Sequence, residues 1–186
     1  MSVLDSYMKD LAELVNKDRG TANIAGVTEA AKIMKGHLES IGFKADLVDL
    51  GPNAGNGLFA TNKPNADHYD VLFNAHLDTV FPDGTAAARP LTVKGDRAYG
   101  PGCSDCKSGV LAIYYALKAA RPKIWKDSPS LLLSTRTKKP VPRLPVRGSR
   151  VSLPNLPVLW FLKQPAQAVS SFAPERFYQL HRDLPR

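Results

Sequence analysis

The chain has 186 residues, a length that suits one domain with a real hydrophobic core. Its formal net charge is +8, but no aromatic interleaving or Gly-Arg repeat accompanies the basic residues, so we expect no nucleic-acid binding. No apolar run is long enough to cross a membrane, and the N-terminus lacks the apolar core of a signal peptide. We therefore expect a cytoplasmic protein that makes no membrane contact.

Helical and extended patterns alternate along the first two-thirds of the chain. Residues 4–15 and 28–41 each carry an apolar stripe with helical spacing, and the second stripe has Thr28 as its expected N-cap and Gly42 after its end. A third helix is predicted at residues 110–120. Short strands are predicted at residues 45–50, 58–61 and 71–73, and a hairpin at 91–93 and 98–99. This alternation predicts an α/β fold with a central sheet flanked by helices.

Two candidate site residues follow the apolar run Val71–Phe73, which is predicted to be a strand buried on both faces. His76 and Asp78 are two residues apart, and in an extended chain this spacing places both side chains on the same side. The C-terminal end of a buried strand is where open α/β sheets bind their ligands. By itself the His-x-Asp pattern is weak, because most such pairs are ordinary surface polar groups.

A second candidate region lies in a glycine-rich turn that leads to Asp105 and Lys107. Gly100 and Gly102 make this turn sharp. Neutral imidazole and carboxylate are ordinary zinc ligands, and one carboxylate can bridge two metal ions. Another carboxylate can orient an imidazole without touching the metal. The two regions together therefore favour a metal site.

Both regions resemble the motifs of one family. His76-Leu77-Asp78-Thr79-Val80 resembles the H-x-D-T-V motif of the co-catalytic zinc peptidases and deacylases, which include glutamate carboxypeptidase, acetylornithine deacetylase and succinyl-diaminopimelate desuccinylase. The stretch from Gly100 to Gly109 resembles the second motif of that family, G-x-G-x-x-D-x-K-x-G. The segment Phe81–Thr85 is most similar to the glutamate carboxypeptidase branch. The resemblance covers roughly residues 1–126, an incomplete catalytic domain of this kind.

The resemblance implies a role for each matching residue. His76 would bind one zinc ion, Asp105 would bridge two, and Asp78 would serve catalysis by orienting His76. Lys107 matches the motif but receives no chemical step; we expect it to balance the charge of Asp105. The implied reaction is hydrolysis of an amide bond in a small peptide or N-acyl amino acid by zinc-bound water.

The composition changes after residue 126. Residues 127–186 contain nine prolines and one glycine and carry +7 of the formal net charge. Such closely spaced prolines predict an irregular, Pro-rich basic tail. Within it, the apolar run Leu131–Leu133 stands where the family has its next strand, which ends in a motif like N-T-D-E-E-x-G-S.

The codons of the residues after Ser134 suggest why that acidic motif is missing. Read one frame over, the codons of residues Ser134–Pro142 can encode His-Thr-Asp-Glu-Glu-Thr-Gly-Ser. We therefore hypothesise that the reading frame was lost between about Trp125 and Ser134, so that residues 127–186 are out of frame. An intact locus whose relatives share this tail would refute the hypothesis.

The missing motif would supply the general base and a zinc ligand, and Lys138 and Lys139 stand where its acids are expected. We therefore expect this chain to be incomplete and inactive, with at most a partial zinc site. The alternative is a non-catalytic fragment or a weak metal-binding module. The family's dimerisation domain is also missing, so the sequence does not give the oligomeric state.

Two further sets of side chains leave alternatives open. Cys103 and Cys106 form a C-x-x-C pattern, which suits a redox pair or half of a thiolate zinc site. We favour the simpler interpretation, in which both are small residues in a tight loop beside Asp105. His37 and His68 are expected to be solvated.

Overall fold

The computed structural model describes residues 2–64, 66, 71–120 and 131–136. Within them the elements follow in this order: α1 (Val3–Val15), α2 (Ile24–Ser40), β1 (Lys44–Val48), β2 (Gly57–Thr61), β3 (Val71–His76), α3 (Thr85–Ala88), β4 (Thr92–Lys94), β5 (Arg97–Tyr99), the helical turn η1 (Cys103–Lys107), α4 (Ser108–Ala119) and β6 (Leu131–Arg136). The alternation of helices and strands confirms the predicted α/β class.

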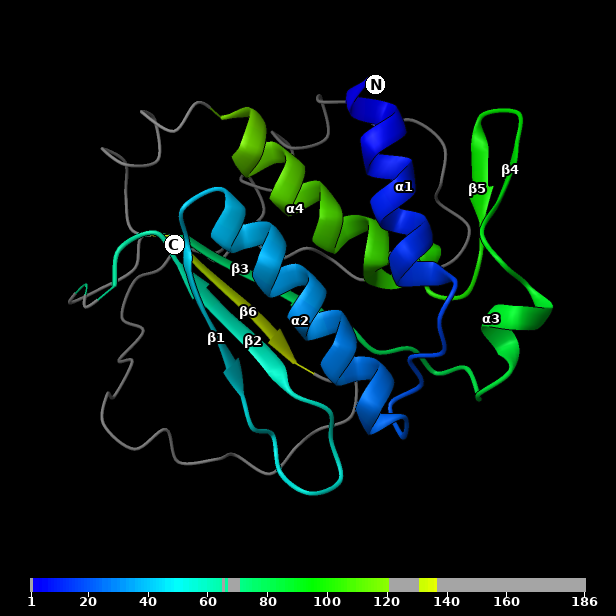
Figure 1. The fold of residues 1–186 in the computed structure, drawn as a ribbon, viewed down its shortest axis with the longest axis horizontal. Helices are drawn as coiled ribbons and strands as arrows, with labels where there is room; N and C mark the ends of the chain where they lie inside the picture. The colour runs from blue at the N-terminus through cyan, green and yellow to red at the C-terminus, as the bar shows by residue number, and fades with distance from the viewer. Residues whose placement is uncertain (1, 65, 67–70, 121–130, 137–186) are drawn as a thin grey trace, which may run out of the picture.

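The four longer strands form one mixed sheet in the order β1-β2-β6-β3. β2 pairs antiparallel with both β1 and β6, whereas β3 and β6 run parallel. Figure 1 shows α1, α2 and α4 on one face of this sheet, with α3 and the β4–β5 hairpin beside them. The parallel pair brings the C-terminal ends of β3 and β6 to the same edge, which is where the candidate site lies.

The helices start at polar caps that the chain supplies locally. Ser2 caps α1 in a capping box with Asp5. Asn23 caps α2, because its side chain accepts a hydrogen bond from the Gly26 amide at 2.8 Å. The prediction that Thr28 caps this helix is therefore wrong: Thr28 lies inside α2, which begins one turn earlier than its apolar stripe indicated.

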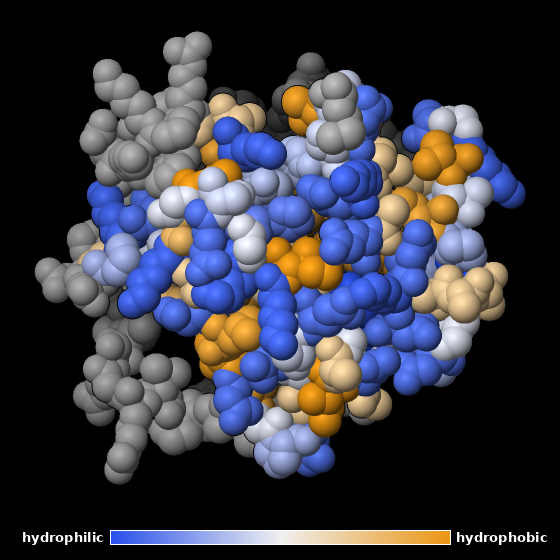
Figure 2. All heavy atoms as spheres, in the orientation of Figure 1, coloured by the Kyte–Doolittle hydropathy of each residue, from blue (hydrophilic) through white to orange (hydrophobic). Residues whose placement is uncertain are grey.

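One hydrophobic core lies between the helices and the sheet. It includes these buried side chains from α1, α2, α4 and the strands: Leu11, Leu14, Val15, Val27, Met34, Leu38, Ala45, Leu58, Ala60, Val110, Leu111, Ile113 and Tyr114. The outward faces of the helices are mainly hydrophilic, as Figure 2 shows. This division follows the helical stripes of the sequence, whose apolar residues point to the sheet.

β3 is less buried than its sequence predicted. Val71, Leu72 and Phe73 are half-buried and Asn74 is exposed, so the prediction of a strand buried on both faces is wrong. The reason is topological, because β3 is the last strand in the order of the described sheet, and its paired neighbour there is β6. An apolar run does not by itself distinguish a central strand from an edge strand.

The apolar run at the start of the C-terminal range forms a strand, as expected. β6 lies between β2 and β3, and its residues Leu131, Leu132 and Leu133 are register partners of Val71, Leu72 and Phe73. Residues 137–186, with Lys138 and Lys139, lie outside the described residues. Among the described helices, none combines the length and apolar character that crossing a membrane requires.

Of the two histidines expected to be solvated, the structure describes only His37. His37 is half-buried, and its ring lies 4.7 Å from the ring of Tyr114, centroid to centroid, so the expectation is wrong for this residue. Its position on the inner side of α2 places it between that helix and α4. His68 lies outside the described residues.

Candidate metal centre

The three predicted site residues come from the end of β3 and the chain after it, and from the turn η1, at one edge of the sheet. His76 is the last residue of β3, and Asp78 follows it as the chain leaves the sheet. Asp105 lies in η1, where its backbone (φ −130°, ψ 90°) and that of Cys106 depart from helical values. Gly102 precedes this turn with φ +72°, a conformation that favours glycine. The turn therefore presents Asp105 toward the end of β3 before α4 begins.

The structure brings all three side chains together. Nε2 of His76 lies 2.9 Å from Oδ1 of Asp105. On the other side of the ring, Nδ1 lies 3.0 Å from the backbone oxygen of Asp78 and 3.5 Å from its Oδ1. The imidazole thus lies between two carboxylates, with Asp78 behind it and Asp105 in front.

Burial distinguishes the two carboxylates. Asp78 is 1% exposed, whereas 45% of the Asp105 side chain is exposed. Burial of the His76 ring disfavours its charged form, but hydrogen bonds to Asp78, Cys106 and Asp105 outweigh this effect and raise the pKa of His76 to about 10. The accessible donors are therefore His76 and Asp105, and Asp78 supports them from the protein interior.

Both cysteines contact backbone groups beside the site. The thiol of Cys106 donates to the backbone oxygen of His76 at 3.1 Å and accepts from its amide at 3.3 Å. The thiol of Cys103 lies 3.7 Å from the backbone oxygen of Ala98, and both cysteines are free. The two side chains bond different segments, which fits the interpretation that they are small residues holding a tight loop.

Lys107 is buried under the same turn. It is 2% exposed, and its Nζ donates to the backbone oxygen of Pro101 at 3.0 Å. Burial lowers the pKa of Lys107 to about 8, an effect that the nearby Arg19 reinforces. The ammonium stabilises the turn that leads to Asp105. That Lys107 also balances the negative charge of Asp105 stays a prediction.

One polar partner of the site was missed by the sequence interpretation. Thr21, in the linker between α1 and α2, donates from its hydroxyl to Oδ2 of Asp78 at 2.6 Å. In the sequence, α2 and the strands β1, β2 and β3 lie between these two residues, and no motif links them. The one available signal was the break in helical pattern after residue 15, which marked a loop without indicating what it contacts.

The donor types at this edge of the sheet fit zinc, because imidazole nitrogen and carboxylate oxygen are its usual ligands. Across the described part of the chain, however, no group of three or more His, Cys, Asp or Glu side chains is placed to hold a metal ion. His76 and Asp105 are therefore two donors of a site that needs further ligands to be complete.

Comparison with known proteins identifies the family resemblance. Residues 72–134 match the model of peptidase family M20/M25/M40. The chain is similar to carboxypeptidase G2 of Pseudomonas sp. (strain RS-16), with 33% identity over 114 residues, which are 61% of this chain and 27% of that protein. These matches confirm the resemblance to metallopeptidases that the two motifs predicted for the N-terminal part of the chain.

Solved structures share the fold. Human carnosine dipeptidase 1 matches with a TM-score of 0.59 and 20% identity over 71% of this chain and 32% of that chain. An M20 family metallo-carboxypeptidase from Sulfolobus solfataricus matches with a TM-score of 0.59 and 24% identity over 75% of this chain and 31% of that chain. The chain thus spans about a third or less of the length of each of these relatives.

Proposed function

We propose that the chain carries the first part of a zinc-dependent peptidase site, in which His76 and Asp105 bind metal and Asp78 orients His76. The observation that carries this proposal is the 2.9 Å approach of His76 Nε2 to Asp105 Oδ1, with Asp78 on the opposite side of the ring. An outer carboxylate on one ring nitrogen leaves the other nitrogen for the metal. When bound, zinc would supply a Lewis acid and an activated water.

The relatives support a proposal for the substrate class. Two of the relatives are, by their names, a carboxypeptidase and a dipeptidase, which supports a peptide substrate. We propose a small peptide or an N-acyl amino acid with a free carboxylate as the substrate of the complete site. The exposed side of Asp105 is where such a molecule would approach, since Asp78 faces the interior.

The site of this exact chain is proposed to be incomplete. A catalytic zinc takes about three protein ligands and keeps one position open for water. The described residues supply two donors, and the general base expected after β6 is replaced in the sequence by Lys138 and Lys139. We propose residues 1–126 as the hydrolase-like part and residues 127–186 as the product of a changed reading frame.

The experiment compares two purified proteins, the chain as given and a version in which the proposed frame is restored. Zinc content is measured by mass spectrometry, and hydrolysis is measured with dipeptides and N-acyl amino acids. We expect the restored protein to bind about two zinc ions and to hydrolyse substrate, and the chain as given to do neither fully. His76→Ala in the restored protein should abolish hydrolysis, whereas His37→Ala should not.

Each other outcome has a definite meaning. Hydrolysis by the chain as given would contradict the proposed inactivity and require ligands from residues 137–186. Zinc binding without hydrolysis in either protein would favour the alternative function, a weak metal-binding module. That alternative is supported by the two donors, His76 at the end of β3 and Asp105 in η1. Absence of zinc from both proteins would contradict the metal site itself.

A further inference from the structure

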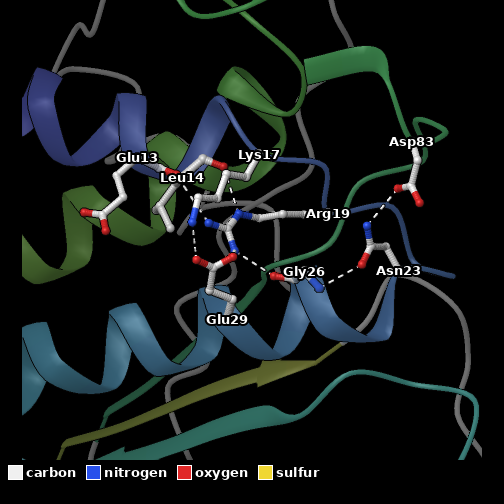
Figure 3. A network of polar contacts seen from close by, with 8 residues as sticks. All are labelled: Glu13, Leu14, Lys17, Arg19, Asn23, Gly26, Glu29 and Asp83. Atoms are coloured by element: carbon white, nitrogen blue, oxygen red, sulfur yellow. Dashed lines mark hydrogen bonds and ion pairs between the residues drawn. The ribbon is translucent and has the colours of Figure 1, made fainter. Parts of the chain in front are cut away.

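The linker between α1 and α2 lies against the segment that follows β3. Several of its polar side chains bond backbone or side-chain groups of that segment: Asn16 to the Leu91 amide (2.6 Å), Asp18 to the amides of Gly84 (2.6 Å) and Ala86 (2.9 Å), and Asn23 to Asp83 (2.8 Å). Figure 3 shows the last of these contacts. Residues 16–23 therefore act as a strap across the chain that leaves the site, and we call them the linker strap.

Arg19 anchors the linker strap to the helices on both sides. Its guanidinium donates to the backbone oxygens of Leu14 (3.0 Å) and Glu13 (3.3 Å) at the end of α1, and to that of Gly26 (2.6 Å) at the start of α2. Figure 3 shows this fork between the two helices. The last carbonyls of a helix lack partners within it, so Arg19 satisfies those of Glu13 and Leu14 and ties the end of α1 to the start of α2 through Gly26.

The linker strap pairs with the chain directly after Asp78. The Thr79 amide donates to the backbone oxygen of Arg19 at 2.8 Å, and the Thr21 amide donates to that of Thr79 at 3.0 Å. A Cβ on Gly20 would lie 2.5 Å from the backbone oxygen of Phe81, so this close approach requires glycine. The pairing sets the position of the Thr21 side chain relative to Asp78.

Thr21 completes the chain of contacts to the site. Its hydroxyl donates to Oδ2 of Asp78 at 2.6 Å and lies 3.2 Å from the backbone oxygen of Thr79. The other carboxylate oxygen, Oδ1, lies 3.5 Å from Nδ1 of His76. Asp78 is almost fully buried, and a buried carboxylate deprived of a hydrogen bond changes its rotamer or its surroundings.

We propose that Thr21 is a positioning residue, which holds the Asp78 carboxylate in the orientation that fixes the His76 ring. This inference rests on the proposed function in one respect, namely that the fixed ring presents Nε2 to a metal ion. The hydroxyl acts through Asp78 and touches neither metal nor substrate. The strap thereby connects the packing of α1 and α2 to the geometry of the site.

The first test needs no metal. In the full chain, the proton on His76 Nδ1 is followed by NMR in the unmodified protein, Thr21→Val, Thr21→Ser and Thr28→Val. Thr28→Val is the matched control: the Thr28 hydroxyl also makes a hydrogen bond to another segment, here by accepting from the Asn56 amide at 3.0 Å. We expect the Nδ1 proton signal to shift or vanish in Thr21→Val alone. The same signal in Thr21→Val and the unmodified protein would overturn the inference.

The second test measures cobalt affinity of the same four proteins from the absorption of the bound ion. Loss of an outer partner of a ligand typically weakens metal affinity 10–100-fold, so we expect about a tenfold loss in Thr21→Val and recovery in Thr21→Ser. Equal affinities in Thr21→Val and the unmodified protein would count against the inference. If the unmodified protein binds no cobalt, the proposed metal site fails, and the NMR comparison still decides the role of Thr21.

Folding of the variants is checked by amide hydrogen exchange. If the amides of Thr21→Val exchange rapidly throughout the protein, that variant is not folded. Thr21→Ser then decides instead, because it keeps the hydroxyl and removes only a methyl group. An Nδ1 signal and cobalt affinity that are both lost in Thr21→Ser, in a protein with normal exchange, would contradict the hydroxyl's role. Retention of both supports it.

Discussion

His76, the last residue of β3, and Arg136, the last residue of β6, are register partners in the parallel pairing of their strands. The chain therefore leaves both strands at the same edge of the sheet. In the family that this chain resembles, the acidic motif with the general base follows the strand corresponding to β6. The pairing of β6 explains why a change of reading frame near this strand would affect the metal site so directly.

Arg19 is expected to be essential for stability. Arg19→Met keeps an apolar stem but removes the donors to three backbone oxygens, Glu13, Leu14 and Gly26. Leaving the Glu13 and Leu14 carbonyls at the end of α1 without this donor should lower the free energy of unfolding by about 2–4 kcal/mol, as measured by urea denaturation. The control is Arg97→Met, on an exposed side chain, which should change it by less than about 0.5 kcal/mol. Equal losses in both variants would contradict the anchoring role.

Two glycines should respond to alanine in opposite directions. Gly102 has φ +72°, and a Cβ there would lie 2.5 Å from Cγ2 of Thr79, so Gly102→Ala should destabilise the protein by about 1–3 kcal/mol. Gly36 lies in α2, and beyond the backbone of its own helix no atom lies within 4 Å of an added Cβ, so Gly36→Ala should stabilise the protein by about 0.5–1 kcal/mol. Thermal denaturation measures both. A stabilising Gly102→Ala would show that the turn before Asp105 is not constrained as described.

Asp18 should make part of the stability depend on acid pH. Hydrogen bonds from the Ala86 and Gly84 amides lower the pKa of its carboxyl below 3.8. This contribution is fully present above the unfolded pKa and is lost as the pH falls through the lower, folded value. In urea denaturation between about pH 2 and 6, the unmodified protein should therefore have a larger free energy of unfolding than Asp18→Asn. This difference should disappear at the acid end of the range.

A matched control for this pH dependence is Asp96→Asn, because the Asp96 side chain is 95% exposed. Its stability should follow that of the unmodified protein across the range. The proposal would be contradicted if the difference in free energy of unfolding between the unmodified protein and Asp18→Asn stayed constant down to the most acidic condition. The hydrogen bonds from the Gly84 and Ala86 amides would then contribute the same stability whether or not Asp18 is charged.

Local patterns predicted the α/β elements and the convergence of His76, Asp78 and Asp105. These residues lie in motifs whose spacing and position after a strand carry the information, so the sequence indicated them before any contact was known. The start of α2 was misplaced because Asn23 caps it ahead of the apolar stripe. The half-buried state of β3 depends on strand order, which a single apolar run does not contain.

The linker strap could not be predicted for a different reason. Thr21 and Asp78 are 57 residues apart, and their hydrogen bond leaves no periodic pattern. Arg19 appeared in the sequence as one basic residue in a polar break, although it is fully buried with its donors on backbone oxygens. Contacts of this kind depend on tertiary packing, whereas propensity and motif spacing describe the local chain.

The central claim is that His76 and Asp105 bind a divalent metal ion together. The most direct measurement is calorimetric titration of zinc into the purified full chain, compared with His76→Ala, Asp105→Asn and the control His37→Ala. We predict that the unmodified protein and His37→Ala bind zinc with the same affinity, and that each site variant binds at least about tenfold more weakly. Zinc binding of unchanged affinity in both His76→Ala and Asp105→Asn would contradict the claim.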